Sequence, residues 1–595
     1  MFRRLEETLP PDPKYPSSLQ ELGFFVDQHG CIRNIKTPEL FYDFHHTNND
    51  RHNELRADAM RACHRKGVFE RLSALGLNRL YLPSLTTTKP DGPHVNILLP
   101  AAKVLKTRKR IVVMINDENY QDLAILAYRL LQREGGLNGG SAINFVKKLI
   151  SRNNPDPNLA EKLSADGAGA DSDKDIPGLI IMNASQLLYS HQFNEAMSLR
   201  SWSAMPRKSI YHEATLVHPV ENRVEGHRTP EEHIKTVFDS VIKNPDFVAP
   251  DAEVYVIAIE GGSAYMINVL NQDFWKYGDR ITAMAIFNTV VNTAQISDPA
   301  LKAFLHTRTR EWKVSELKDP SKVLDLPHDY NVSPPTAPAE RKTVNWLVFS
   351  KPVPSPFWTS FTDFSCPTLG SKKRPVNSAD YSTVPKPKES ESTIFYGAEA
   401  LCPTFGGGDT WVGECIFTQP AVQDAVLDFF EDVAQDPKNY SNPAFTLDIP
   451  QPTPDNPLEL DPSFAPLSTM PEETLTEEQQ AFNDAEAALI EMQIALSSTP
   501  STTATFKDSR ERLVTRIAKK EAEVKDLAKT ALATGGLGAD AANRLRAKWM
   551  PTTEPQTQFA GVESDREEGL KVLDSEAGLP DTVKEELKKL YLNDE

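Results

Sequence analysis

The sequence predicts an α/β fold built on a doubly wound, mostly parallel sheet and followed by an acidic helical region. Between residues 79 and 433, short apolar runs rich in β-branched side chains alternate with longer amphipathic stretches, the order expected of strands joined by crossover helices. The run at 109–117 is apolar at consecutive positions, which indicates a strand buried on both faces. Hydrophobic residues make up 39% of the chain, enough for a sizeable core.

The first half of the chain begins with a small β unit at 15–46, in which two short strands flank a turn at Gly30. A polar stretch at 151–177, poor in aromatic residues, is expected to be a flexible insertion, and 190–228 a long loop. Apolar periodicity predicts helices at 53–75, 121–134 and 142–150 and strands at 79–83, 95–100, 109–117 and 178–183.

The second half of the sheet region contains a clearly signalled helix start. Thr229 is the expected N-cap, Pro230 occupies the first helical position and Glu232 completes a capping box. Residues 351–395, rich in Pro, Ser and Lys, are expected to form a second flexible insertion. The other predicted elements are strands at 253–259, 281–288, 346–350 and 399–409 and helices at 298–312 and 422–433.

The composition of the chain changes after residue 435, where 30 acidic residues face only 17 basic ones. Two stretches in this region place apolar residues on one helical face, which predicts a pair of packed helices. The predicted organisation is an N-terminal tail (1–14), an α/β domain (15–435), a Pro-rich acidic linker (436–472), a helical hairpin (473–535) and an acidic tail (536–595) with a short helix at 581–592.

Charge and cysteine usage restrict the class of protein. The net charge of −18 argues against a chain that binds nucleic acid over its whole surface. Five widely spaced cysteines without a CxxC pair fit reduced thiols, and therefore the nucleus and cytoplasm. No run of 18 apolar residues exists, so no membrane span and no membrane partner are expected.

The glycine-rich and histidine-rich segments predict neither a cofactor nor a metal. Residues 135–141 and 405–409 lack the Gly-Lys-Ser/Thr of a phosphate-binding loop. The histidines of 212–218 are six residues apart rather than four, so they miss a shared helical face. His45, His46 and His52 read as part of a polar loop before a helix.

The stretch EVYVIAIEGGSAY at 253–265 has the strand, glycine turn and helix of a nucleophile elbow. In a hydrolase, the residue at the sharp turn is Ser, Cys or Asp. Here the residue at that position is Ile259 or Glu260, depending on where the strand ends. Ile259 has no nucleophilic atom, and Ser263 lies beyond both glycines on the first helical turn. A structural use of this turn is therefore favoured over catalysis, with an unconventional nucleophile at Ser263 or Glu260 as the alternative.

Several segments, in order, resemble a known family. They are YPSSLQELGFFVDQHGCIRNIKTPELF, KRIVVMIND, PEEHIKTVFD, EGG and CPTFGGGD with VLDFFEDV. Together these segments, over residues 15–435, resemble the fungal Argonaute-binding domain family, whose members include the second Argonaute-binding subunit of the Argonaute siRNA chaperone complex. Related domains occur at the C-terminus of fungal class II histone deacetylases and in animal cotranscriptional regulators. The resemblance implies an α/β-hydrolase-like fold.

The resemblance also implies where a hydrolase constellation would stand. Aligning the paired glycines with Gly261 and Gly262 places the elbow nucleophile at Ile259 and its preceding histidine at Ala258. The acid after the next strand falls at Asn288, the late histidine falls near Trp411, and the oxyanion-hole residues fall near Asn116 and Asp117. Because a triad works as a unit, the loss of all three members predicts a pseudo-hydrolase.

The expected function is a non-catalytic scaffold that binds an Argonaute protein, alone or through the companion Argonaute-binding subunit. It would act in RNA interference-directed heterochromatin assembly and gene silencing, without touching nucleic acid directly. The alternatives are a histone- or chromatin-binding module and an esterase-like hydrolase with an unconventional nucleophile. Trp346, Trp411 and the 190–228 loop are candidate contact elements.

Overall fold

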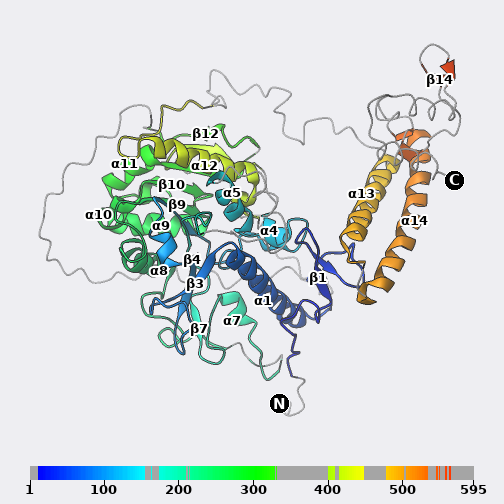
Figure 1. Ribbon diagram of the computed structural model, residues 1–595, viewed down its shortest axis with the longest axis horizontal. Helices are drawn as coiled ribbons and strands as arrows, with labels where there is room; N and C mark the ends of the chain where they lie inside the picture. Colours follow the sequence, from blue (N-terminus) through cyan, green and yellow to red (C-terminus); the bar gives the residue numbers. More distant parts are fainter. Residues whose placement is uncertain are drawn as a thin grey trace, which may run out of the picture. The chain divides into compact units, whose positions relative to one another are not determined.

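The structure is a computed structural model of the 595-residue chain. It describes residues 11–153, 163, 173–209, 212, 215–315, 317–328, 330, 400–408, 414–447, 477–501, 504–533, 545–546, 548–549, 557–558 and 562–563. The chain divides into two compact units (Figure 1). The first contains residues 65–129 and 138–451, and the second contains residues 12–64, 130–137 and 452–595.

The first unit is organised around a nine-stranded mixed sheet, which confirms the predicted fold class. The spatial order of its strands is β12-β13-β11-β10-β9-β5-β6-β4-β3, and the six from β13 to β6 run parallel. The strands are β3 (Leu77–Leu82), β4 (Val95–Pro100), β5 (Arg110–Ile115), β6 (Leu179–Ile181), β9 (Glu253–Ile259), β10 (Ala283–Phe287), β11 (Thr309–Lys313), β12 (Val323–Asp325) and β13 (Thr404–Gly406).

The central strand β9 is buried on both faces, as the unbroken apolar run predicts. Alternate residues Val254, Val256 and Ala258 belong to one core cluster. The opposite face presents Tyr255, whose ring lies 4.9 Å from that of Phe430. The last register pairs of β9 join Ala258 to Ile115 of β5 and Ile259 to Phe287 of β10, so the three strands end at the same edge.

Helices cover both faces of this sheet (Figure 1). In α8, the Glu232 N–H donates to Thr229 Oγ1 at 3.2 Å, and Glu232 Oε2 accepts from the N–H of Arg228 instead of closing back on Thr229. The helices are α1 (Asp50–Ala74), α2 (Ala102–Leu105), α3 (Tyr128–Leu131), α4 (Gly136–Gly139), α5 (Ile143–Asn153), α7 (Leu199–Ser203), α8 (Pro230–Val237) with the π-helical turn η2 (Phe238–Ile242), α9 (Gly261–Gln272), α10 (Phe274–Tyr277), α11 (Pro299–Arg308) and α12 (Pro420–Gln435).

Two predicted helices differ from the structure. The stretch 121–134 is mostly irregular and keeps only α3, because Asp122 and Ile125 form bridges and Ala124 adopts a φ of 63°. The helix predicted to reach residue 312 ends at Arg308, and Trp312 lies in β11, stacked between Phe287 and Phe405. The 190–228 loop contains β8 (Glu195–Met197), paired with β7 (Leu188–Ser190), and α7. The strand predicted at 346–350 and the helix at 581–592 lie outside the described residues.

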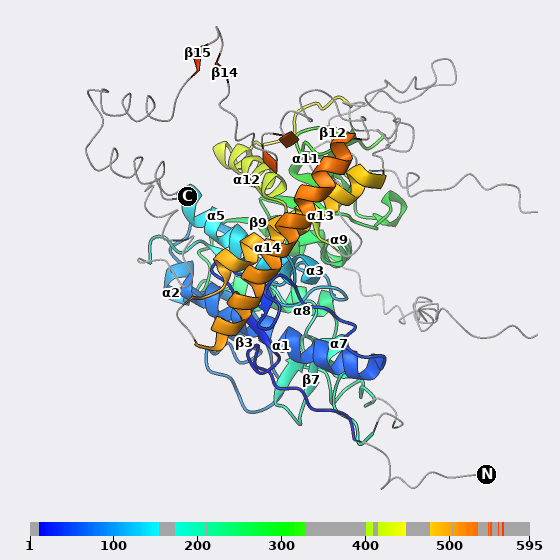
Figure 2. The same cartoon turned by 90° about the vertical axis from the view of Figure 1, so that its right-hand side faces the viewer.

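The second unit contains the predicted N-terminal β unit and the predicted helical hairpin. Strands β1 (Phe24–Val26) and β2 (Ile32–Asn34) pair antiparallel around a turn at Gly30, whose φ is 85°. The long helices α13 (Glu477–Ser498) and α14 (Ala504–Ala533) pack along each other, as Figure 2 shows in yellow and orange. A small ladder joins β14 (Thr557–Gln558) to β15 (Val562–Glu563). Among the helices that the structure describes, none is long and apolar enough to cross a membrane.

Candidate functional site

The carboxyl edge of the parallel strands holds the candidate site. In parallel sheets, the loops after neighbouring strands converge at this edge and form the usual ligand crevice. Here β5 is followed by Asn116 and Asp117, β9 by Glu260, and β10 by Asn288. Trp411, expected after β13, lies outside the described residues.

The backbone conformation of an elbow belongs to Glu260. Its φ is 51° and its ψ is −117°, a region that residues other than glycine rarely adopt and that is common at functional turns. Ile259 is the last residue of β9, fully buried and paired with Phe287, so it does not form the turn. Alignment on the paired glycines assigns the elbow to Ile259, but the geometry assigns it to Glu260, with small Ala258 and Gly262 two residues away on either side.

The β5 loop closely approaches both glycines of the turn, and at Gly262 the close atoms belong to the backbone. A Cβ atom on Gly261 would lie 2.2 Å from Asp117 Oδ1. A Cβ atom on Gly262 would lie 2.5 Å from the carbonyl oxygen of Ile115 and 2.9 Å from that of Asn116. Strand β5 and helix α9 can therefore pack at this distance only over glycine.

Two carboxyl groups lie together at the elbow. Gln121 connects them, because its Oε1 accepts from the Asp117 N–H at 2.9 Å and its Nε2 donates to Glu260 Oε2 at 3.4 Å. Asp117 Oδ2 also accepts the N–H groups of Asn119 and Tyr120. Burial raises the pKa of Glu260 to about 7, and the negative charge of Asp117 adds to the rise.

This raised pKa predicts a pH-dependent cost to folding. Glu260 ionises near pH 4.5 in the unfolded chain but near 7 in the folded one, so its contribution to stability is lost as pH rises across that window. The glutamine in Glu260→Gln cannot ionise. The free energy of unfolding of this variant should therefore rise by up to ~3 kcal/mol relative to that of wild type between pH 4.5 and 8. Urea unfolding of both proteins at the two pH values measures this difference. If the free energies of unfolding of variant and wild type differ by the same amount at both pH values, the raised pKa of Glu260 is contradicted.

The Ser263 hydroxyl is bound inside the fold. It donates to the carbonyl oxygen of Ala258 at 2.5 Å and accepts from the Phe287 N–H at 3.3 Å, and the residue is fully buried. These bonds tie the start of α9 to β9 and β10, so the hydroxyl is not presented at the crevice. The Cys415 thiol is also buried, and burial together with the charge of Glu260 raises the pKa of Cys415 well above its ordinary value.

The predicted acid and oxyanion positions also have structural roles. Asn288 has a φ of 44°, donates its N–H to the carbonyl of Trp312 and accepts the Val314 N–H on its Oδ1. It thereby joins the end of β10 to the end of β11. Asn116 Oδ1 accepts from the Ala184 N–H at 3.0 Å, and its Nδ2 donates to Ser185 Oγ at 3.3 Å.

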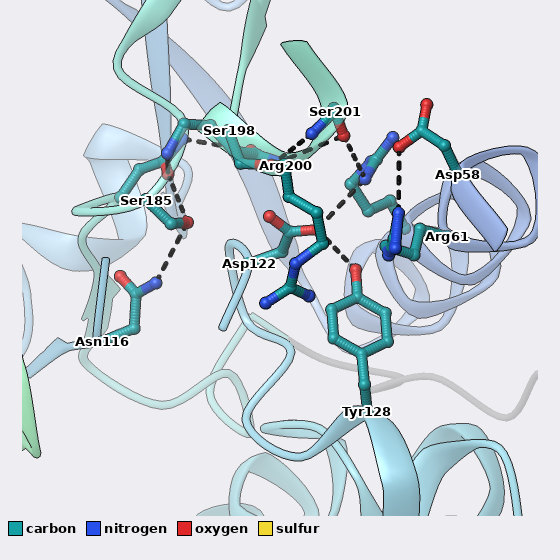
Figure 3. A network of polar contacts seen from close by, with 12 residues as sticks. Asp58, Arg61, Asn116, Asp122, Tyr128, Ser185, Ser198, Arg200 and Ser201 are labelled. Carbon is teal, nitrogen blue, oxygen red and sulfur yellow. Dashed lines mark hydrogen bonds and ion pairs between the residues drawn. The ribbon is translucent and has the colours of Figure 1, made fainter. Parts of the chain in front are cut away.

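A polar network that the sequence analysis did not single out fixes the loops beside Asp117 (Figure 3). Arg65 pairs with Asp122 at 3.1 Å and contacts Ser201 Oγ at 3.4 Å, and the Tyr128 hydroxyl donates to Asp122. Arg200 donates to the carbonyl oxygen of Asn119 at 2.6 Å. The partners are separated by up to 136 residues, so no local pattern could have revealed them.

Apolar side chains stand exposed around the same edge. Tyr120 follows β5 and is 67% exposed, Val290 follows β10 and is 77% exposed, and Val314 follows β11 and is 46% exposed. Their common signal in the sequence is a large apolar residue within a few positions after a buried strand. The described residues contain no group of three or more His, Cys, Asp or Glu side chains that could hold a metal ion.

Comparisons with known proteins identify the family of this chain. The model of the Arb2 domain matches residues 15–319, which is half of the chain. The "Cotranscriptional regulator ARB2A homolog" of Xenopus tropicalis is 23% identical over 352 residues, covering 57% of this chain and 79% of the frog protein. No solved structure matches the chain.

Proposed function

Because the chain belongs to the Arb2 domain family, we propose that it is a nuclear regulator of gene expression that acts by binding proteins and not by turning over a substrate. More specifically, we propose that the chain is a scaffold that binds an Argonaute protein and the companion Argonaute-binding subunit. The scaffold would serve a siRNA chaperone complex in heterochromatin assembly and gene silencing. The name of the frog relative, a cotranscriptional regulator, supports the coarser role.

The observation that carries a non-catalytic role is the chemistry of the elbow. Acyl-transfer hydrolases present a hydroxyl or thiol there, next to a base that accepts its proton. Here the strained turn presents Glu260, and the hydroxyl of Ser263, on the first turn of α9, is fully buried and bonded to Ala258. The acid position holds Asn288, whose amide is engaged with Val314.

The exposed residues Tyr120, Val290 and Val314 support protein binding at the same edge. Exposed apolar residues grouped on one face are typical of interaction sites, and aromatic residues dominate the energy of many interfaces. The carboxyl groups of Asp117 and Glu260 add negative charge, which suits a partner surface containing Lys or Arg.

Affinity capture from nuclear extract tests the proposal. Full-length chain should retain an Argonaute protein or the companion subunit, and the triple variant Tyr120→Ser/Val290→Ser/Val314→Ser should retain at least about tenfold less. Trp275→Ser is the matched control, since this partly exposed aromatic residue lies in α10, beyond the far end of α9. Capture of nucleosomes without either Argonaute partner would replace the scaffold proposal with the chromatin-binding alternative.

A second candidate function rests on the strain at Glu260. A positive φ at a residue other than glycine costs about 1–3 kcal/mol, and such strained residues cluster at active sites and binding sites. Ionised above pH 7, the Glu260 carboxylate could attack an ester carbonyl and expel the alcohol as its anion, and water would then hydrolyse the resulting mixed anhydride and free Glu260. The test is hydrolysis of p-nitrophenyl esters at pH 8. Activity in wild type that is lost in Glu260→Gln would establish this function and contradict the non-catalytic proposal. Equal background rates in both proteins are expected.

A further inference from the structure

Residues 436–447, which follow α12 and are named the strap from here on, lie against the junction of α11 and β11. The strap contains neither a helix nor a strand, and side chains of the α/β unit bind its backbone. Arg308 donates to the carbonyl oxygen of Pro437 at 2.7 Å and to that of Lys438 at 2.9 Å. Extended peptides on receptor surfaces are held in the same way, through hydrogen bonds to their main chain.

The central anchor of the strap is Asn442, which is 9% exposed. Its Nδ2 donates to the carbonyl oxygens of His306 and Thr309, each at 2.9 Å. Its Oδ1 accepts from Arg310 Nε at 3.2 Å and from the Tyr440 hydroxyl at 3.1 Å. Both donors and both acceptor sites of the amide are therefore used, so the surface selects asparagine at this position.

The need for such an anchor comes from the way α11 ends. Helix α11 passes directly into β11, because Thr309 is already extended with a φ of −124° and a ψ of 142°. The last carbonyl groups of a helix have no partner inside the helix. Here the Asn442 N–H donates to the carbonyl oxygen of Thr307 at 2.7 Å, beside the bond from its side chain to His306. The end of α11 thus presents acceptors that an asparagine in an extended peptide satisfies.

An aromatic contact lies three residues beyond Asn442. The ring of Phe445 lies 5.3 Å from that of Phe405, at 89°, and stacks on that of Tyr330 at 6.2 Å. The Tyr330 hydroxyl also donates to the carbonyl oxygen of Pro443 at 2.8 Å. A residue before proline favours the extended backbone, so Pro443 sets the spacing between the two anchors. With Tyr440, the recognised sequence is Tyr-x-Asn-Pro-x-Phe.

Outside these anchors the strap is exposed to water. Between residues 436 and 447, all of which the structure describes, Asn442 is the only buried residue. Segments with few buried side chains open locally at a much lower free energy than the whole domain unfolds. The surface beneath the strap can therefore become free while the sheet stays folded.

We propose that the junction of α11 and β11 is a binding site for Tyr-x-Asn-Pro-x-Phe peptides and that the strap is its built-in ligand. When the strap opens, an extended segment of a partner protein with this sequence takes its place. Because the strap is joined directly to α12, its effective concentration is roughly millimolar, and it keeps weaker ligands out. Asn442 lies at the start of β11, whereas Glu260 follows the end of the parallel strand β9, so this site is separate from the elbow.

Fluorescence polarisation with a labelled peptide of residues 436–447 tests this proposal on the full-length chain. Wild type should bind the peptide weakly, because its own strap competes. Asn442→Ala should release the strap and bind the peptide at least about tenfold more tightly. Asn439→Ala is the matched control and should bind like wild type, since Asn439 is exposed and donates to Asp436 within the strap. A peptide with alanine in place of Asn442 should bind neither protein.

Hydrogen exchange of the wild-type chain gives a measurement that needs no variant. Amides of the strap should exchange at least about 100-fold faster than those of β11. Equal protection of the two segments, or an Asn442→Ala chain that fails to fold, would overturn the proposal, since the strap would then be a permanent part of the domain. An unchanged peptide affinity in Asn442→Ala would overturn it as well, because the strap would not be occupying the peptide's site.

Discussion

Replacing Gly262 by alanine is expected to lower the free energy of unfolding by about 3 kcal/mol or more. The added methyl group would lie 2.5 Å from the carbonyl oxygen of Ile115 and 2.9 Å from that of Asn116. Both contacts are to backbone atoms at the end of strand β5, so no side chain can rotate to relieve them. The start of α9 would have to separate from β5 and disturb the Ser263 hydroxyl bonds as well.

Urea unfolding followed by tryptophan fluorescence measures this loss. Gly139→Ala is the matched control, because nothing lies within 4 Å of a Cβ atom at that position. The control should change the free energy of unfolding by less than about 1 kcal/mol. A Gly262→Ala protein as stable as the control would show that the turn has room for a side chain.

The buried pair His227 and His233 should destabilise the fold in acid. His233 Nε2 accepts from the Asn183 N–H at 3.2 Å, so its Nδ1 carries the proton and donates to His227 Nδ1 at 2.8 Å. His227 Nε2 then carries a proton and has no hydrogen-bond partner among the residues that the structure describes. Burial lowers the pKa of His227 to about 4, and burial together with His227 lowers the pKa of His233 well below its usual value.

The sign of the effect follows from proton uptake. The unfolded chain binds protons near pH 6.5 and the folded chain does not, so stability falls as pH drops from about 6.5 to 4. His227 alone accounts for ~3 kcal/mol over this range. Glu260 and Glu311 act in the opposite direction, because burial raises the pKa of each to about 7.

The histidine contribution is therefore measured as a difference. The free energy of unfolding of wild type minus that of His227→Phe should decrease by about 3 kcal/mol between pH 7 and 4. The exposed Val290→Ser, which removes no titratable group, serves as control and should give a difference independent of pH to within about 0.5 kcal/mol. If the difference between wild type and His227→Phe does not change with pH, the folded protein binds protons at this pair as readily as the unfolded chain does.

The sheet could be predicted from the sequence because several of its inner strands are almost entirely apolar. Three strands are buried on both faces, at residues 95–100, 109–117 and 253–259. Because both faces need apolar side chains, the sequence of each strand is a continuous apolar run and lacks the 3.6-residue period of an amphipathic helix. Trp312 shows the limit of that reasoning. Its strand TREWK contains three charged residues, and only the stacking of Trp312 on the rings of Phe287 and Phe405, 25 and 93 residues away, shows why the strand is buried.

The location of the elbow was predictable, but its central residue was not. Glycine spacing points to Ile259, whereas the residue with positive φ is set by where β9 stops pairing with β10, at Ile259 and Phe287. Burial raises the pKa of Glu260, and part of the rise comes from the charge of Asp117, which is 143 residues away in the chain. Such a pair becomes visible only when the strand order places β5 beside β9.

The second unit has a consequence for biosynthesis. The Phe25 ring lies 4.9 Å from that of Phe506, and Glu39 pairs with Arg516, so this unit joins the two ends of the chain. At about 5–20 residues per second, a ribosome needs roughly 25–100 s to synthesise the 481 residues between Phe25 and Phe506. During that interval β1 and β2 emerge without their helical partner, whereas the strands of the sheet can pair as they appear. The β1–β2 unit is therefore made well before its helical partner, and until that partner emerges it is available to chaperones and proteases.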